Sequence, residues 1–190
     1  MVIYGMFFGS HQYSTTLIKD GKILYAVENE RITRIKHGHS WFESPKASYV
    51  AIEKATGIKF EDVDYIAISD PGQFRYDLSS YDNSPDKVAN YYYFKQKFKA
   101  FDKPIMLFEH HQCHAATGYY LAGFNEKTLI ITMDGGSNER NYTTVWLGKG
   151  GEMTKVHQNL ESLEGSLGCI WFELCKHFGY TPVKDEGKIM

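Results

Sequence analysis

Cysteine pairs, long apolar runs and an excess of one charge are all missing from this chain. The three cysteines, Cys113, Cys169 and Cys175, are an odd number without Cys-x-x-Cys spacing, so no disulfide framework is expected. No apolar run reaches the about 18 residues that a membrane span requires, and no signal-peptide pattern opens the sequence. We therefore expect a soluble, cytoplasmic protein with reduced thiols and no membrane partner.

The charge balance argues against nucleic acid as a partner. With 21 Lys and Arg against 23 Asp and Glu, the net charge of −2 leaves little for a dedicated phosphate-binding face. Aromatic residues, in contrast, are plentiful, with 14 Tyr and 12 Phe. Residues 90–101 interleave several of them with lysines. A base-stacking platform would give this pattern, but we favour an amphipathic helix that packs its aromatic face on a core or a partner.

Apolar segments of strand length form a pattern that repeats once. The first copy predicts three strands and a helix, at residues 2–8, 13–18, 23–27 and 45–55. The second copy predicts the same series, at residues 128–133, 142–147, 153–157 and 165–178. Two strands, at residues 63–68 and 104–108, and a helix at 111–121 lie between the copies, together with the aromatic segment 90–101. The pattern predicts an α/β protein with a duplicated lobe.

Two histidines four residues apart could share one metal ion. His110 and His114 lie at the start of a predicted helix, where this spacing puts both rings on one face. They follow a predicted strand, and ligand sites of α/β proteins gather at such junctions. Two histidines that bind no metal would give the same pattern. His111 points elsewhere, for packing or for contact with a substrate.

The strand that opens the second copy ends in Asp134, Gly135, Gly136 and Ser137. The carboxylate of Asp134 could bind a cation, and the glycines would let backbone amides approach a phosphate without a Cβ in the way. A simple hairpin turn has the same sequence. Together with the histidine pair, however, Asp134 completes two imidazoles and one carboxylate, a set that suits Fe(II), Mn(II) or Zn(II).

Two more segments could face an anionic ligand. His11 lies in the turn between the first two strands, where it could hydrogen-bond a phosphate or a transferred group, or simply face water. Residues 28–37 mix acidic and basic side chains. They form either a solvated strand end or a segment that directs Arg31, Arg34 or Lys36 toward an anion.

In this order, the segments resemble the NodU/CmcH family of carbamoyltransferases. The family opens with His-Asp-Ala-Ser, an Asp-Gly turn and Glu-Glu-Glu-Arg-Phe-Thr-Arg-x-Lys-His, and the corresponding residues here are 11–14, 20–21 and 28–37. Five later family motifs are His-His-x-x-His-Ala-Ala, Gly-Phe-(Asp/Asn)-Glu, Asp-Gly-Gly, Ser-Leu-Gly and Glu-Gly-Lys-x-Met. They match residues 110–116, 123–126, 134–136, 166–168 and 186–190. The resemblance covers essentially the whole chain, and the series is far more specific than any one motif.

The resemblance implies an actin-like ATPase (ASKHA) fold of two ribonuclease-H-like lobes, the first complete at residues 1–124 and the second partial at 125–190. It implies that His110, His114 and Asp134 hold a divalent metal, for which Fe(II) is the first candidate. The tRNA threonylcarbamoyl-transferase subunit is similar and uses the same histidine pair. The ligand would be a carbamoyl-adenylate made from ATP and carbamoyl phosphate, bound by Lys36, Gly135, Gly136, Ser137 and Lys188. His11 would assist transfer of the carbamoyl group to a hydroxyl of a sugar or secondary metabolite.

Two departures from the family pattern bear on activity. Gln12 stands where the family has Asp, and Tyr13 where it has Ala. If the family Asp is a general base, a neutral Gln cannot replace it, so either His11 suffices or this member is altered in transfer. Family members also continue through the rest of the second lobe and a domain that makes the carbamoyl-adenylate. We therefore expect this chain to be a fragment that is inactive alone.

Two other functions fit parts of the pattern. A non-catalytic, nucleotide-binding module would explain Gln12. A sugar kinase or acetate-kinase-like phosphotransferase would share the fold but would not need the pair of His110 and His114. In a fragment, the helix at 165–178 would also leave apolar side chains uncovered, which predicts self-association. These side chains are Leu167, Ile170, Phe172 and Leu174.

Overall fold

The computed structural model describes residues 1–8, 13–35, 44–69, 103–135, 142–159, 166–182 and 184–189. The chain divides into two compact units, Met1–Phe108 and Glu109–Met190. Within these described ranges, every helix is too short or too polar to cross a membrane.

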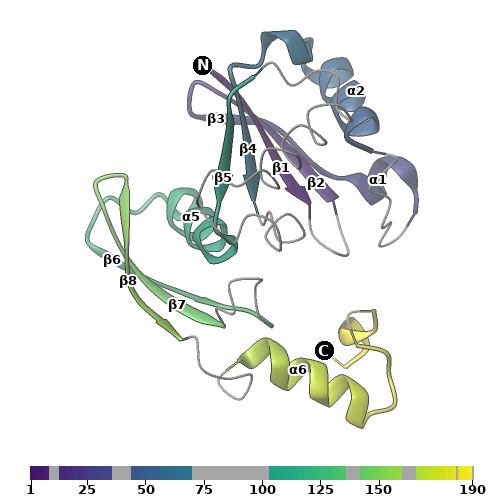
Figure 1. Cartoon of the computed structure of the whole chain (residues 1–190), viewed down its shortest axis with the longest axis vertical. Helices are drawn as coiled ribbons and strands as arrows, with labels where there is room; N and C mark the ends of the chain where they lie inside the picture. Colours follow the sequence, from purple (N-terminus) through teal and green to yellow (C-terminus); the bar gives the residue numbers. More distant parts are fainter. Residues whose placement is uncertain are drawn as a thin grey trace, which may run out of the picture. The chain divides into compact units, whose positions relative to one another are not determined.

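The first unit contains a five-stranded mixed sheet with the strand order β3-β2-β1-β4-β5 (Figure 1). Strands β1 (Val2–Phe8), β2 (Tyr13–Lys19) and β3 (Lys22–Glu28) form an antiparallel meander. Asp20 and Gly21, both with positive φ, make the tight turn between β2 and β3. Strand β4 (Tyr65–Ser69) pairs in parallel with β1, and β5 (Ile105–Phe108) pairs in parallel with β4.

An apolar core lies between this sheet and helix α2 (Ser44–Thr56), which covers one face of the sheet (Figure 1). Strand β1 alternates, so that its even-numbered residues Val2, Tyr4 and Met6 are buried on one face. Ile66 and Ile68 of β4 join the same cluster, as does Ile52 of α2. Gly57, with a φ of 73°, ends the helix as its sequence predicts.

The segment after β3 is a short helix, so the alternative of a solvated strand end is wrong for residues 29–33. Helix α1 (Asn29–Thr33) begins directly after Glu28, and a 3₁₀ turn, η1 (Phe60–Asp62), follows α2. Asn29 is buried, and its side-chain carbonyl finds a partner there by accepting a hydrogen bond of 3.0 Å from the Ser48 hydroxyl of α2. The exposed Arg31 lies within ion-pair distance of Glu28 and Glu30.

The second unit contains an antiparallel sheet with the strand order β6-β7-β8, made of β6 (Thr128–Met133), β7 (Thr143–Lys149) and β8 (Glu152–Asn159). Helix α5 (His110–Ala122) packs on one face of it. Helix α6 (Leu167–His177) and a 3₁₀ turn, η3 (Glu186–Lys188), follow. Gly148 of β7 leaves room for Tyr119 of α5, because a Cβ there would lie 2.6 Å from the Tyr119 ring. This contact lets α5 lie close against the sheet.

The structure confirms two separate sheets within the described residues, each opened by an antiparallel three-strand meander. The aromatic helix predicted at residues 90–101 lies outside them. Helix α5 contacts β6 and β7, so the compact units divide between Phe108 and Glu109. The lobe boundary predicted at residue 124 lies on the other side of α5 and stays a prediction.

Candidate metal centre

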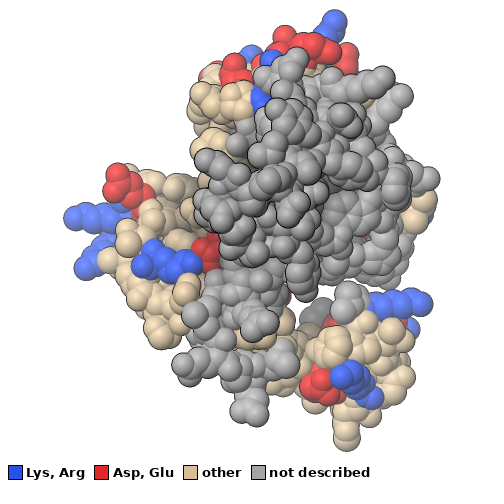
Figure 2. All heavy atoms as spheres, in the orientation of Figure 1, with Lys and Arg blue, Asp and Glu red and all other residues tan. Residues whose placement is uncertain are grey.

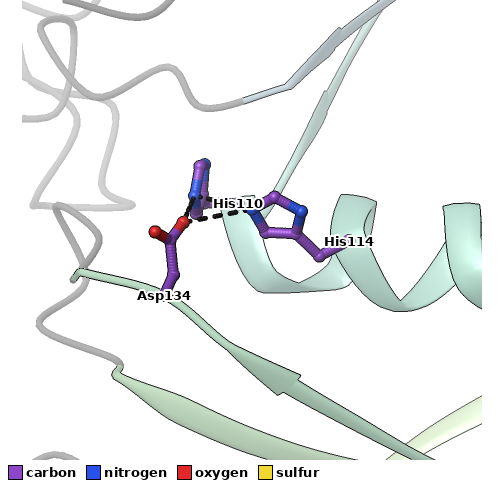
Figure 3. A group of neighbouring side chains, drawn as sticks. All are labelled: His110, His114 and Asp134. Atoms are coloured by element: carbon purple, nitrogen blue, oxygen red, sulfur yellow. Dashed lines mark hydrogen bonds and ion pairs between the residues drawn. The ribbon is translucent and has the colours of Figure 1, made fainter. Parts of the chain in front are cut away.

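Helix α5 presents its two histidines from one face, beside the stripe that is buried on the sheet. His111, Ala115 and Tyr119 recur every four residues and are all buried, which fixes the rotation of the helix. His110 and His114 are also four apart, and their rings meet edge to face with centroids 4.6 Å apart. Both imidazoles therefore project from α5 toward the end of β6 (Figure 3).

Asp134 is held at that end of β6 by its backbone. Its amide donates to the carbonyl of Tyr142 at 3.0 Å, and its carbonyl accepts from the Ser166 hydroxyl. The two oxygens of the carboxylate have different partners. Oδ1 accepts a hydrogen bond of 2.6 Å from the amide of Gly135, whereas Oδ2 faces the two imidazoles (Figure 3).

Three side-chain atoms converge at this point. Nε2 of His110 lies 2.6 Å from Oδ2 of Asp134, Nε2 of His114 lies 3.1 Å from it, and the two nitrogens are 3.0 Å apart. Hydrogen bonds cannot account for all three short distances at once. If both imidazoles donate an N–H to the carboxylate, neither nitrogen has a lone pair left to accept from the other, although the two nitrogens are 3.0 Å apart. A single cation among the three lone pairs would give all three atoms a common partner. At usual bond lengths its ligand atoms would be about 3.0–3.4 Å apart. The distances of 3.0 and 3.1 Å match this range, and the 2.6 Å between His110 and Asp134 would lengthen when the ion binds.

The electrostatics of the site favour an ionised carboxylate. Partial burial alone would raise the pKa of Asp134, but hydrogen bonds from His110, His114 and the Gly135 amide outweigh it. Together they hold the pKa far below the usual range of a carboxyl. The three groups fulfil the geometric requirement for a metal site, and exposure falls from His114 through Asp134 to His110. The site is therefore open on the side of His114.

The other residues predicted for the nucleotide are placed only in part. Gly135 is exposed next to Asp134. Lys188 forms an ion pair of 2.8 Å with Asp185 and lies over the Tyr180 ring; the hydrogen bond to Asp185 and its charge raise the pKa of Lys188. The remaining four lie outside the described residues: His11, Lys36, Gly136 and Ser137. Their roles stay predictions.

Two contacts that support α5 carry no signal in the sequence. His111 is fully buried, and its Nδ1 lies 2.6 Å from Oγ1 of Thr132, which resolves its role in favour of packing. Glu109, just before His110, forms a half-buried ion pair with Lys155 of β8. Both depend on which residues of distant strands lie opposite α5, so no spacing along the chain indicates them.

Comparison with known proteins gives a match over nearly the whole sequence. A model of the carbamoyltransferase N-terminus family matches residues 3–76 and 79–190. Nodulation protein NolNO of Sinorhizobium fredii is 30% identical over 191 residues, covering 95% of this chain and 27% of that protein. The uncharacterized protein MJ1058 of Methanocaldococcus jannaschii is 33% identical over 120 residues, covering 57% of this chain and 20% of that protein. The chain spans roughly a quarter of the length of these relatives.

A solved structure gives the fold. Component A of the (R)-2-hydroxyglutaryl-CoA dehydratase of Acidaminococcus fermentans superposes with a TM-score of 0.55 at 17% sequence identity, covering 97% of this chain and 56% of that chain. A likeness at this identity bears on the fold alone. The α/β fold is that of the actin-like ATPases, as the sequence predicts.

Proposed function

This chain belongs to the carbamoyltransferase N-terminal family, and we propose that it supplies the metal centre and part of the nucleotide site of a carbamoyltransferase. The single observation that carries the proposal is the triangle formed by Nε2 of His110, Nε2 of His114 and Oδ2 of Asp134, with sides of 2.6, 3.0 and 3.1 Å. Two imidazoles and one carboxylate with open positions suit a divalent transition ion, for which Fe(II) is our candidate.

The residues present fit such an ion. His110 and His114 are fixed by the packing of α5, and Asp134 is fixed by backbone hydrogen bonds on both sides. When bound, the ion would supply positive charge that binds and polarises phosphate oxygens of the nucleotide. Gly135, Gly136 and Ser137, which continue from Asp134, would add backbone amides to the same phosphates, and Lys36 and Lys188 would add cationic groups.

The reaction that we propose is transfer of a carbamoyl group from an ATP-derived carbamoyl-adenylate to a hydroxyl. The acceptor oxygen bonds to the carbamoyl carbon, the bond from that carbon to the phosphate oxygen breaks, and AMP leaves. The hydroxyl proton passes to a base, for which His11 is our candidate. Because the chain spans roughly a quarter of the length of its relatives, we propose this activity for a protein of their length and not for this chain alone.

An assay of the full-length protein tests the proposal. ATP, carbamoyl phosphate and Fe(II) are supplied with a panel of hydroxylated sugars and aminoglycosides, and carbamate esters are detected by mass spectrometry. We expect product from the wild type and none from Asp134→Ala. Equal product from both proteins would contradict a role for this centre. If no ester forms although nucleotide binds, the non-catalytic module is the better account.

A further inference from the structure

The N-terminus of α6 lies directly against the backbone that carries Asp134. The Ser166 hydroxyl donates to the Asp134 carbonyl, and the Cys169 thiol donates to the Gly135 carbonyl at 3.2 Å. Between these two contacts, Gly168 is so close that a Cβ on it would lie 2.2 Å from the nitrogen of Gly135 and 2.5 Å from its Cα. The two segments therefore meet backbone to backbone, with no space for a side chain.

Ser166 joins α6 to the metal centre through one buried hydroxyl. Its oxygen accepts a hydrogen bond of 3.1 Å from the amide of Cys169, which caps the helix, while its proton goes to the Asp134 carbonyl. The residue is fully buried. A shift of the start of α6 must therefore either move Asp134 or leave a buried polar group without its partner.

We propose that Ser166 and Gly168 are positioning residues that hold Asp134 where its carboxylate can share a cation with His110 and His114. The proposal rests on the proposed function for the identity of the ligand. Catalytic and binding groups must stay within roughly 0.5 Å of their working geometry. To accept a Cβ at residue 168, the start of α6 and the Asp134–Gly135 backbone would have to separate by about 1 Å, twice that tolerance.

The chain offers a control with the opposite expectation. Gly118 is also a helical glycine, in α5, but a Cβ there meets nothing within 4 Å. Replacing glycine by alanine inside a helix normally stabilises the helix. If Gly168 were an ordinary helix residue, Gly168→Ala would behave like Gly118→Ala. If it positions Asp134, the two variants separate.

The test compares wild type, Gly118→Ala, Gly168→Ala and Ser166→Ala in this chain by two readouts: Co(II) titration followed by visible absorption, and amide chemical shifts of the metal-free protein. We expect Gly168→Ala and Ser166→Ala to bind Co(II) about 10- to 100-fold more weakly, with altered absorption bands. Gly118→Ala should match the wild type. We also expect the Asp134 and Gly135 amide signals to move in both site variants.

Wild-type affinity and spectra in both Gly168→Ala and Ser166→Ala would overturn the proposal. If Gly168→Ala does not fold, Ser166→Ala, which removes only a hydroxyl, decides. If the wild type binds no Co(II), the metal centre itself is wrong, and the amide signals then decide the positioning role. Shifts that stop at α6 and leave Asp134 and Gly135 unchanged would overturn it, whereas shifts at those two residues would support it.

Discussion

In the first unit β1 buries Val2, Tyr4 and Met6 against α2, whereas in the second unit the corresponding opening strand, β6, buries Ile130 and Thr132 against α5. The first interface is a continuous apolar cluster. The second contains a buried polar chain, in which Trp146 donates to Thr144, and Thr144 and Thr132 lead to His111. Apolar packing is non-directional, but hydrogen bonds fix a helix in rotation and register.

The hydrogen bonds occur in the unit whose helix carries the histidine pair. The series of hydrogen bonds that begins at Trp146 ends at His111, which lies between His110 and His114 in the sequence of α5. All of its members are buried. If Trp146 donates to Thr144 and each threonine donates onward, every group finds one partner and His111 accepts through Nδ1. The orientation of the histidine pair is thereby tied to the sheet.

The largest effect on stability is expected in the apolar core of the first unit. Ile66 is fully buried on β4, so Ile66→Ala removes methyl groups that cannot be replaced by rearrangement. We expect the free energy of unfolding to fall by about 2–5 kcal/mol in urea denaturation. Ile23→Ala on β3, where the side chain is 50% exposed, is the control and should stay within about 0.5 kcal/mol. Equal losses in the two variants would contradict this assignment of the core.

The polar chain of the second unit should respond to a change that keeps shape and removes one hydroxyl. Thr144→Val leaves the Trp146 indole N–H without its 2.6 Å acceptor. We expect a loss of about 1–3 kcal/mol in the free energy of unfolding. Thr154→Val, at an exposed position of β8, makes the same substitution without this cost. If Thr144→Val is as stable as Thr154→Val, the hydrogen bonds that run from Trp146 to His111 do not hold α5 in place.

Acid should weaken the second unit through Asp134. Because the folded state holds the pKa of this carboxyl below its ordinary value of 3.8, the carboxylate stabilises the fold above about pH 4. That stabilisation is lost as the pH falls toward the lower, folded-state pKa. In chelator-treated protein, the slope of unfolding free energy against pH below 4 should be shallower for Asp134→Asn than for wild type. Identical slopes would show that the hydrogen bonds around Asp134 contribute nothing.

The smallest effect on stability is expected on α6, where changes should act on association instead. Leu167 and Ile170 are about half exposed, and Figure 2 shows mostly uncharged surface over the described part of this end of the chain. We expect the chain to self-associate at micromolar concentration, and Ile170→Ser to reduce association. Lys149→Ser, at the end of β7, is the control. A wild type that sediments as a monomer throughout this range would contradict the expectation.

The sequence was sufficient for the elements that its local pattern determines. Apolar segments of strand length, with the Asp20-Gly21 turn between the second and the third, predicted β1 to β3, and the spacing of His110 and His114 predicted a shared helix face. The local pattern did not predict helix α1, because its mixed charges are typical of a solvated strand end. In the structure, a buried hydrogen bond between Asn29 and Ser48 accompanies this helix. The Ser-Leu-Gly motif could be recognised in the sequence. Its contact with Asp134 joins residues that are 32 positions apart, and it exists only in the folded chain. Spacing predicts which side chains share a face; it cannot predict which backbones touch.

Metal binding by the triangle of His110, His114 and Asp134 is the central claim. The most direct measurement titrates Fe(II), Mn(II) or Zn(II) into wild type, His114→Ala and Asp134→Ala of the full-length protein at pH 7.5. His157→Ala, at an exposed position of β8, is the control. We expect one ion per chain in wild type and control, and binding at least about 10-fold weaker in the two site variants. Wild-type affinity should also fall below about pH 6.5, because a protonated imidazole has no lone pair for the ion. Equal metal content in all four proteins would contradict the site.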